Sequence, residues 1–232
     1  MDHWALIALS VAAGGLVQGS TGVGFALVVS PVLALLAPAL LPGSVLILML
    51  PLNAYVAWRE REAIDRRGTA WITTGRCVGG VAGLAVLAML PGNALRVFVG
   101  VATIATAFGS LAGGAFSLRV PLLVGAGVVT GVTETATGIG GPPMALVYQH
   151  QPGAVLRATL AVCFLIGQVV SLIMLAAVGR LSIAQVDAAL WLMPALAAGA
   201  LVSRWLHGRV DGRPMRVAML GFAMVSGVVC LV

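Results

Sequence analysis

Two glycine-rich segments contain most of the small polar residues that could bind a ligand. Residues 18–24 read QGSTGVG, and residues 131–143 read GVTETATGIGGPP. A helix that begins at such a turn presents backbone N–H groups without an intrahelical partner, and these groups suit a small anion. The absence of a Cβ on glycine lets the anion approach the backbone. The candidate substrate-binding residues are therefore Gln18, Ser20, Thr21, Gly22, Gly24, Thr137, Gly138, Gly140 and Gly141.

Two charged residues, Arg76 and Glu134, lie inside otherwise apolar runs. The guanidinium of Arg76 could bind an oxyanion through two N–H groups, or it could extend from its helix towards water. Glu134 could carry a proton and so couple transport to a gradient, or it could neutralise Arg76 or lie solvated. The three Cys have no metal-binding spacing, so we expect neither a metal nor a cofactor.

The composition places these residues in a membrane protein. Of all residues, 60% are hydrophobic and 9% are charged. A soluble domain carries about a quarter charged residues and could not bury so much apolar surface in one core. The net charge of +6 comes from Arg in short connectors, which indicates membrane topology rather than nucleic-acid binding.

The apolar runs divide into ordinary spans and broken stretches. A helix needs about 20 apolar residues to cross the hydrocarbon core. Six runs fit one span each, near 42–58, 70–90, 94–114, 154–178, 186–206 and 214–232. The stretches 4–37 and 120–150 are too long for one span, and each is interrupted by one of the glycine-rich segments.

These stretches begin two copies of an internal repeat, predicted at 1–116 and 117–232. Gly15-x3-Gly19 matches Gly127-x3-Gly131, and Gly22-x-Gly24 matches Gly138-x-Gly140, so the second copy has four extra residues at its tip. Later in each copy, Trp71 pairs with Trp191 and Gly79 with Gly199. Each copy is expected to hold one broken hairpin and three transmembrane helices.

Arginine positions predict that the two copies are inverted. The connectors 59–67 and 204–216 each carry four Arg, and the positive-inside rule places both in the cytoplasm. This requires the stretch 120–150 to cross an even number of times, as a re-entrant hairpin or as two full spans. Both termini are then extracytoplasmic.

Length favours hairpins, because arms of about 13 to 16 residues extend only roughly 20–24 Å at the helical rise. Two hairpins from opposite sides would bring their tips together near the membrane midplane. Ser20, Thr21 and Thr137 could cap the second arms there or donate hydroxyls to a ligand.

The paired glycine motifs at 15–24 and 127–143, with the Leu-Arg and Met-Arg dipeptides at 95–96 and 215–216, resemble those of the sulfite exporter TauE/SafE family of bacterial membrane transporters. The resemblance covers essentially the whole chain. It implies transport of a small sulfur oxyanion, such as sulfite or an organosulfonate, across the bacterial cytoplasmic (inner) membrane. Phe25-Ala26 stands where many relatives continue with glycine.

The resulting prediction is an all-α, multi-pass secondary transporter with a midplane anion site at the two glycine tips. A passive anion channel is the alternative. An enzyme is not expected, because the sequence offers no clustered nucleophile, base or metal set. The expected partners are the small anion and membrane lipid, with a homodimer as a possible assembly. The exact substrate, the direction and the driving ion stay open.

Overall fold

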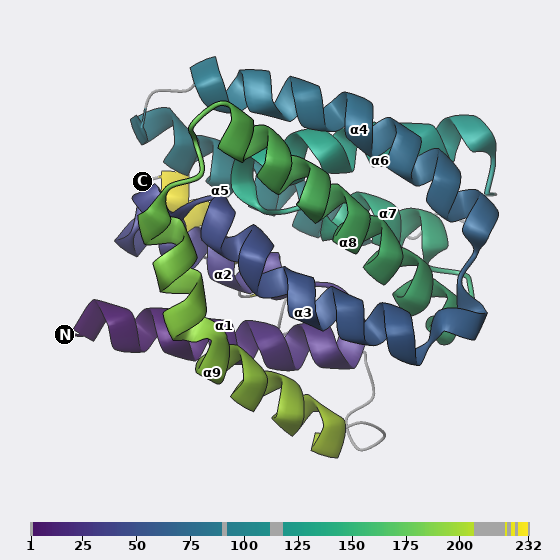
Figure 1. Ribbon diagram of the computed structural model, residues 1–232, viewed down its shortest axis with the longest axis horizontal. Coiled ribbons are helices and arrows are strands. Elements are labelled where there is room, and N and C mark those ends of the chain that lie inside the picture. The colour runs from purple at the N-terminus through teal and green to yellow at the C-terminus, as the bar shows by residue number, and fades with distance from the viewer. Residues whose placement is uncertain are drawn as a thin grey trace.

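The protein is a bundle of helices that run mostly along one direction (Figure 1). The computed structural model describes residues 2–89, 92–111, 118–206, 221, 224–225 and 227–231. The regular elements among them are all helices. Five of these helices are long and apolar enough to cross a membrane. The predicted class, an all-α integral membrane protein, is confirmed.

Eleven labelled elements follow one another within the described ranges. They are α1 (Asp2–Thr21), α2 (Phe25–Leu36), η1 (Pro38–Leu40), α3 (Gly43–Arg59), η2 (Arg61–Ala63), α4 (Arg66–Met89), α5 (Gly92–Leu111), α6 (Val120–Thr137), α7 (Gly141–Tyr148), α8 (Gly153–Ala177) and α9 (Ile183–Leu206). Five of the predicted spans overlap α3, α4, α5, α8 and α9. Most of the sixth, near 214–232, lies outside the described residues.

The two broken stretches each combine a long arm with a short one. The long arms are α1, with 20 residues, and α6, with 18. The short arms are α2, with 12 residues, and α7, with 8. The expectation of two similar short arms was therefore wrong, because the apolar run before each glycine turn continues as one helix. Each turn lies between a span-length helix and a fragment too short to span.

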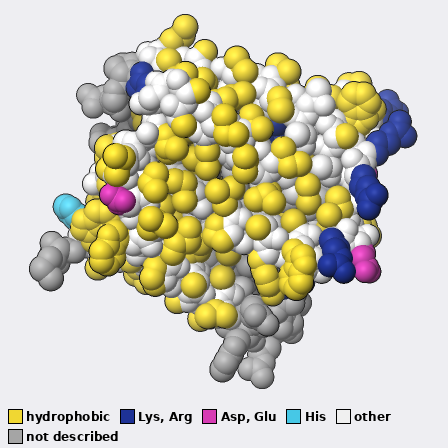
Figure 2. Space-filling view, viewed as in Figure 1, with side chains coloured by type: hydrophobic (Ala, Val, Ile, Leu, Met, Phe, Trp, Pro, Cys, Tyr) yellow, Lys and Arg dark blue, Asp and Glu magenta, His cyan; other side chains and the backbone are white. Residues whose placement is uncertain are grey.

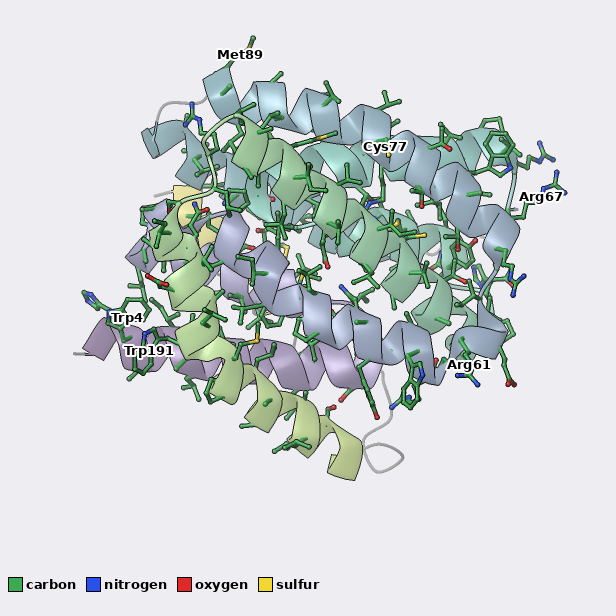
Figure 3. All side chains as sticks on the ribbon, in the orientation of Figure 1. Trp4, Arg61, Arg67, Cys77, Met89 and Trp191 are labelled. Carbon is green, nitrogen blue, oxygen red and sulfur yellow. The ribbon has the colours of Figure 1, made fainter. Side chains whose placement is uncertain are left out.

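Each broken stretch returns to the end of the bundle where it began. Arg61 and Arg67 mark one end, called here the arginine end, while Trp4, Met89 and Trp191 lie at the opposite end (Figure 3). Tyr148, the last residue of α7, donates a hydrogen bond of 2.7 Å to Asp65 Oδ2 at the arginine end. After α2, the carbonyl of Leu41 accepts a hydrogen bond of 3.1 Å from the side-chain amide of Gln185. Gln185 lies near the start of α9 at the opposite end.

Close glycine contacts join α4 to α6 and α1 to α9. A Cβ on Gly79 would overlap the carbonyl oxygen of Val128, and one on Gly199 would overlap that of Ala12. Small residues allow such close helix packing in membranes, where apolar side chains gain nothing by leaving lipid. Both helix pairs therefore pack backbone against backbone.

The contacts also correct the matching of the long arms. A Cβ on Gly15 would approach Leu196 O at 2.9 Å and Ala200 N at 3.4 Å, and one on Gly131 would approach Arg76 O at 2.5 Å and Gly80 N at 2.8 Å. Gly15 thus occupies the place of Gly131, one helical turn from the predicted partner Gly127. The four extra residues of the second copy are not at its tip. Division into two inverted repeats at 116/117 stays a prediction, and this boundary lies outside the described residues.

The outer surface suits a lipid environment. The face shown in Figure 2 is covered mainly by hydrophobic side chains, and Arg side chains gather towards the arginine end. Large apolar residues such as Val78, Ile173 and Leu201 are more than half exposed. In water so many exposed apolar side chains would drive association, whereas in a bilayer they contact acyl chains.

Candidate functional site

The two glycine tips adopt the same turn. Gly22 and Gly138 have φ values of +80° and +81°, in the left-handed region that favours glycine. Gly22 N donates to Gln18 O at 2.8 Å, and Gly138 N donates to Glu134 O at 2.7 Å. Each long arm therefore ends in one left-handed residue that reverses the chain.

The hydroxyls of the tips stabilise these turns and not the short arms. Thr21 Oγ1 accepts from Val23 N at 3.3 Å, and Thr137 Oγ1 accepts from Ile139 N at 3.1 Å. Ser20 Oγ donates to Leu16 O at 2.9 Å, within its own helix. The expected capping of α2 and α7 by these hydroxyls was wrong, because each hydroxyl reaches a carbonyl or a turn amide beside its own arm.

Gln18 performs the capping at the first tip. Its Oε1 accepts 3.1 Å from the N–H of Phe25, the first residue of α2. Its Nε2 donates 3.1 Å to Gly22 O and 3.3 Å to Asn53 Oδ1. One buried amide thus connects the end of α1, the start of α2 and the middle of α3.

The two tips contact each other inside the bundle. A Cβ built on Gly141, the first residue of α7, would lie 3.5 Å from Val23 Cβ in the first tip and 3.9 Å from Phe164 Cζ. Pro142 and Pro143 follow in the first turn of α7, and proline has no N–H to donate. The second tip therefore offers fewer backbone donors than the first, so the two tips are not equivalent for an anion.

Gly24 and Gly140, the residues that precede the two short arms, also differ from each other, in their backbone conformation. Gly24 precedes α2 with φ +118°, whereas Gly140 precedes α7 with φ −133°. The carbonyl of Gly140 accepts 3.1 Å from Thr130 Oγ1, and a Cβ there would lie 2.9 Å from Glu134 Cβ. Gly140 is thus confined by the side chains of α6.

A chain of buried polar side chains connects the tips. From Gln18, hydrogen bonds continue through Asn53 Nδ2 to Gln168 Oε1 at 3.1 Å, and through Gln168 Nε2 to Glu134 Oε1 at 3.1 Å. Glu134 Oε2 pairs with Arg76 Nη2. All five residues are at most 3% exposed. Gln18 and Glu134 occupy corresponding places, one turn before Gly22 and Gly138, so the chain joins two related positions across α3 and α8.

Arg76 is the buried cation at this centre. Its guanidinium lies over the Phe164 ring, 5.2 Å from the ring centroid. The guanidinium also packs against Gly167, where a Cβ would overlap it. The ion pair with Glu134 was one of the three predicted alternatives for that acid. Arg76 Nε and Nη1 have no hydrogen-bond partner among the described residues. Since a buried charged donor without a partner is costly, these two nitrogens are candidate donors to an anion.

Phe164 and Gly167 were not predicted as site residues. An aromatic and a glycine in an apolar helix give no signal until the position of Arg76 is known. Asn53 and Gln168 carried a weak signal, as lone amides at membrane depth that most often join helices. The groups of three or more His, Cys, Asp or Glu needed to hold a metal do not occur in the described part of the chain.

Apolar spans, two broken helices and a polar centre where their breaks meet define a membrane transporter. The chain belongs to the family described as Sulfite exporter TauE/SafE, whose family model matches residues 6–230. A search of the curated proteins found no match, and neither did a search of the solved structures. The family description indicates an exporter of sulfite or related sulfur compounds, and the resemblance noted from the glycine motifs is confirmed.

The Arg76–Glu134 pair should dominate the stability of this centre. Removing one partner leaves an uncompensated buried charge, so Arg76→Leu or Glu134→Leu should each lower the free energy of unfolding by about 3–5 kcal/mol. The double variant should recover much of that loss, because neither charge remains. Thermal and denaturant unfolding of purified protein measures both effects.

The exposed pair of Arg59 and Glu60 provides the control, since Arg59→Gln should change stability by about 1 kcal/mol or less. Equal losses in the single and double variants would contradict the pairing.

Proposed function

We propose that the protein is a secondary transporter that moves a small sulfur oxyanion, such as sulfite or an organosulfonate, through a site where the two glycine tips meet. The observation that carries the proposal is the contact of Gly141 with Val23 beside the incompletely hydrogen-bonded Arg76. The first tip would supply backbone N–H groups at the start of α2, and Arg76 would supply guanidinium N–H groups beside the second. Both kinds of donor suit an oxyanion.

Burial of the polar centre favours a transporter over an open channel. The turn glycines of both tips are buried, as is Thr137, while Ser20, Thr21 and Val23 of the first tip and Gly141 of the second are half-buried. A conducting pore needs a continuous wetted path past its binding groups. A polar centre whose members are all buried fits a protein whose halves open in turn.

The protein would lie in the bacterial cytoplasmic membrane with the arginine end towards the cytoplasm, by the positive-inside rule. Figure 3 places the start of α1 near Trp4 at the opposite end, which supports an extracytoplasmic N-terminus. The hairpin of α1 and α2 would then enter from outside, and that of α6 and α7 from the cytoplasm.

Gly141 offers a sharper test of the site than Gly24 or Gly140. Its added Cβ would make only ordinary contacts, whereas Gly24 has a positive φ and Gly140 is confined by Glu134 and Thr130. Gly141→Val should fill the space between the tips and lower sulfite affinity about tenfold or more, the effect of losing one charge-assisted hydrogen bond of about 1.5–3 kcal/mol. Equilibrium binding to purified protein measures this.

Gly125→Val is the matched control, because a Cβ at Gly125 meets nothing within 4 Å. It should bind sulfite like the unmodified protein. Normal affinity in a folded Gly141→Val protein would refute the shared site.

Glu134 is our candidate for coupling to protons, since it contacts Arg76 and the amide chain at once. Glu134→Gln should abolish the dependence of flux on the pH gradient in proteoliposomes, because the neutral amide carries no proton. Glu62→Gln, at an exposed acid of the connector after α3, should keep that dependence. A pH dependence unchanged in Glu134→Gln would mean that the acid only neutralises Arg76.

Orientation can be tested by cysteine labelling in a protein whose native Cys are replaced. Cys at Ile183, 80% exposed at the opposite end, should react with an impermeant reagent added outside whole cells. Cys at Ile64 at the arginine end should be shielded, as should Cys at Val210, which lies outside the described residues. Labelling of the Cys at Ile64, with protection of the Cys at Ile183, would show that the orientation is the reverse of the one proposed.

A further inference from the structure

Arg157 covers the first glycine tip. It lies one turn after the start of α8, and a Cβ on Gly22 would be 2.6 Å from Arg157 Cγ and 3.3 Å from both its Cβ and its Cδ. The aliphatic part of the side chain therefore packs against the left-handed turn. Its charged group extends from there towards the connector between α3 and α4.

Glu60 of that connector holds the guanidinium. Arg157 Nε lies 3.2 Å from each carboxylate oxygen of Glu60, and Nη2 lies 3.0 Å from Oε1. Arg59 also contacts Glu60, at 2.6 Å, so the carboxylate would keep a cationic partner if Arg157 left. The side chains of Arg157 and Glu60 are 22% and 13% exposed. A pair that water reaches is worth little, so its partners can exchange.

A surface pocket adjoins this ion pair. Its volume is about 450 Å³, and it is lined by residues 58–63 and by Ala154 in the first turn of α8. Glu60 is part of the lining, together with Arg59 and Arg61. An anion that enters this pocket would meet two arginines and two carboxylates, those of Glu62 and of Glu60, which holds Arg157.

The second tip has an apolar residue in the corresponding place. A Cβ on Gly138 would lie 2.8 Å from Val45 Cγ1. Val45 lies near the start of α3, and Arg157 lies near the start of α8. Among the described residues around the two turns, a cation therefore packs on the first turn and a methyl group on the second. The first turn is thus in direct contact with a partly exposed cation, whereas the cation beside the second tip, Arg76, is buried.

We propose that Arg157 is an anion-binding residue of the transporter. Its guanidinium would release the carboxylate of Glu60 and bind the substrate instead, beside the first tip. The planar guanidinium binds two oxygens of a carboxylate side by side, and sulfite or a sulfonate presents two oxygens in a similar arrangement. Glu60 thus occupies the position that the substrate would take. The inference rests on the proposed function and adds to it a binding step at the arginine end.

The test is a double-mutant cycle with sulfite and ethanesulfonate as probes. Arg157→Gln should weaken binding about tenfold or more, as for one lost charge-assisted hydrogen bond. Glu60→Gln should strengthen binding, because it removes the competing carboxylate. In the Arg157→Gln background, Glu60→Gln should have no further effect. Arg157→Lys should restore part of the affinity, since it keeps the charge without the planar fork.

Arg66→Gln and Arg67→Gln are the matched controls, as exposed arginines at the start of α4 that do not line the pocket, and both should bind like the unmodified protein. Wild-type affinity in folded Arg157→Gln would overturn the inference while leaving the site of Arg76 and the tips intact. So would a gain from Glu60→Gln that does not need Arg157. Failure of the unmodified protein to bind either probe would overturn the proposed function, and this inference with it.

Discussion

The interruption of two helices inside a membrane is the constraint on which this structure depends. Backbone N–H and C=O groups released at Gly22 and Gly138 cannot be hydrated by lipid, so protein must surround and satisfy them. The left-handed turns return one N–H each to Gln18 O and Glu134 O. The side chains of the same two residues begin the polar chain through Asn53 and Gln168. The residues that close the turns thus also supply the ends of the hydrogen-bonded centre.

The near-symmetry of the tips makes their differences informative. Corresponding positions carry a neutral amide at Gln18 and an acid at Glu134, and the acid is matched by Arg76, whose counterpart in α9 is Leu196 by the glycine contacts. Prolines replace backbone donors at the start of α7, where the guanidinium lies close by. The hairpin with fewer backbone donors is therefore the one that has a charged donor, Arg76, beside it. An anion would meet backbone dipoles from one hairpin and a side-chain cation beside the other.

The sequence predicted the architecture well because the bilayer makes hydropathy almost sufficient. Span length, glycine interruptions and arginine connectors each follow from one strong physical rule. The sequence did not predict the alignment of the long arms or the residue that caps α2, because both depend on packing at the scale of one helical turn. The match of Gly15 to Gly127 was reasonable on spacing alone, and the contacts of Gly15 with Leu196 and of Gly131 with Arg76 are what correct it. Capping was misassigned for a related reason: Thr21 is closer in sequence to the start of α2 than Gln18 is, and only the folded turn brings the Gln18 amide to the N–H of Phe25.

The movement that the proposed transport cycle requires would have to change these contacts without exposing unsatisfied groups to lipid. The seams of α4 with α6 and of α1 with α9 pack backbone to backbone at Gly79 and Gly199, so each pair is suited to move as a unit. Both pairs join a long arm of one predicted repeat to a helix of the other. Motion between them would be concentrated at the contact of α3 with α8, where Asn53 bonds Gln168. This hydrogen bond between two amides, with the weaker one from Gln168 to Met49 Sδ, is weak enough to break. Asn53 then keeps Gln18 as a partner, and Gln168 keeps Glu134. The polar chain can therefore separate at its middle while the turn on each side stays satisfied.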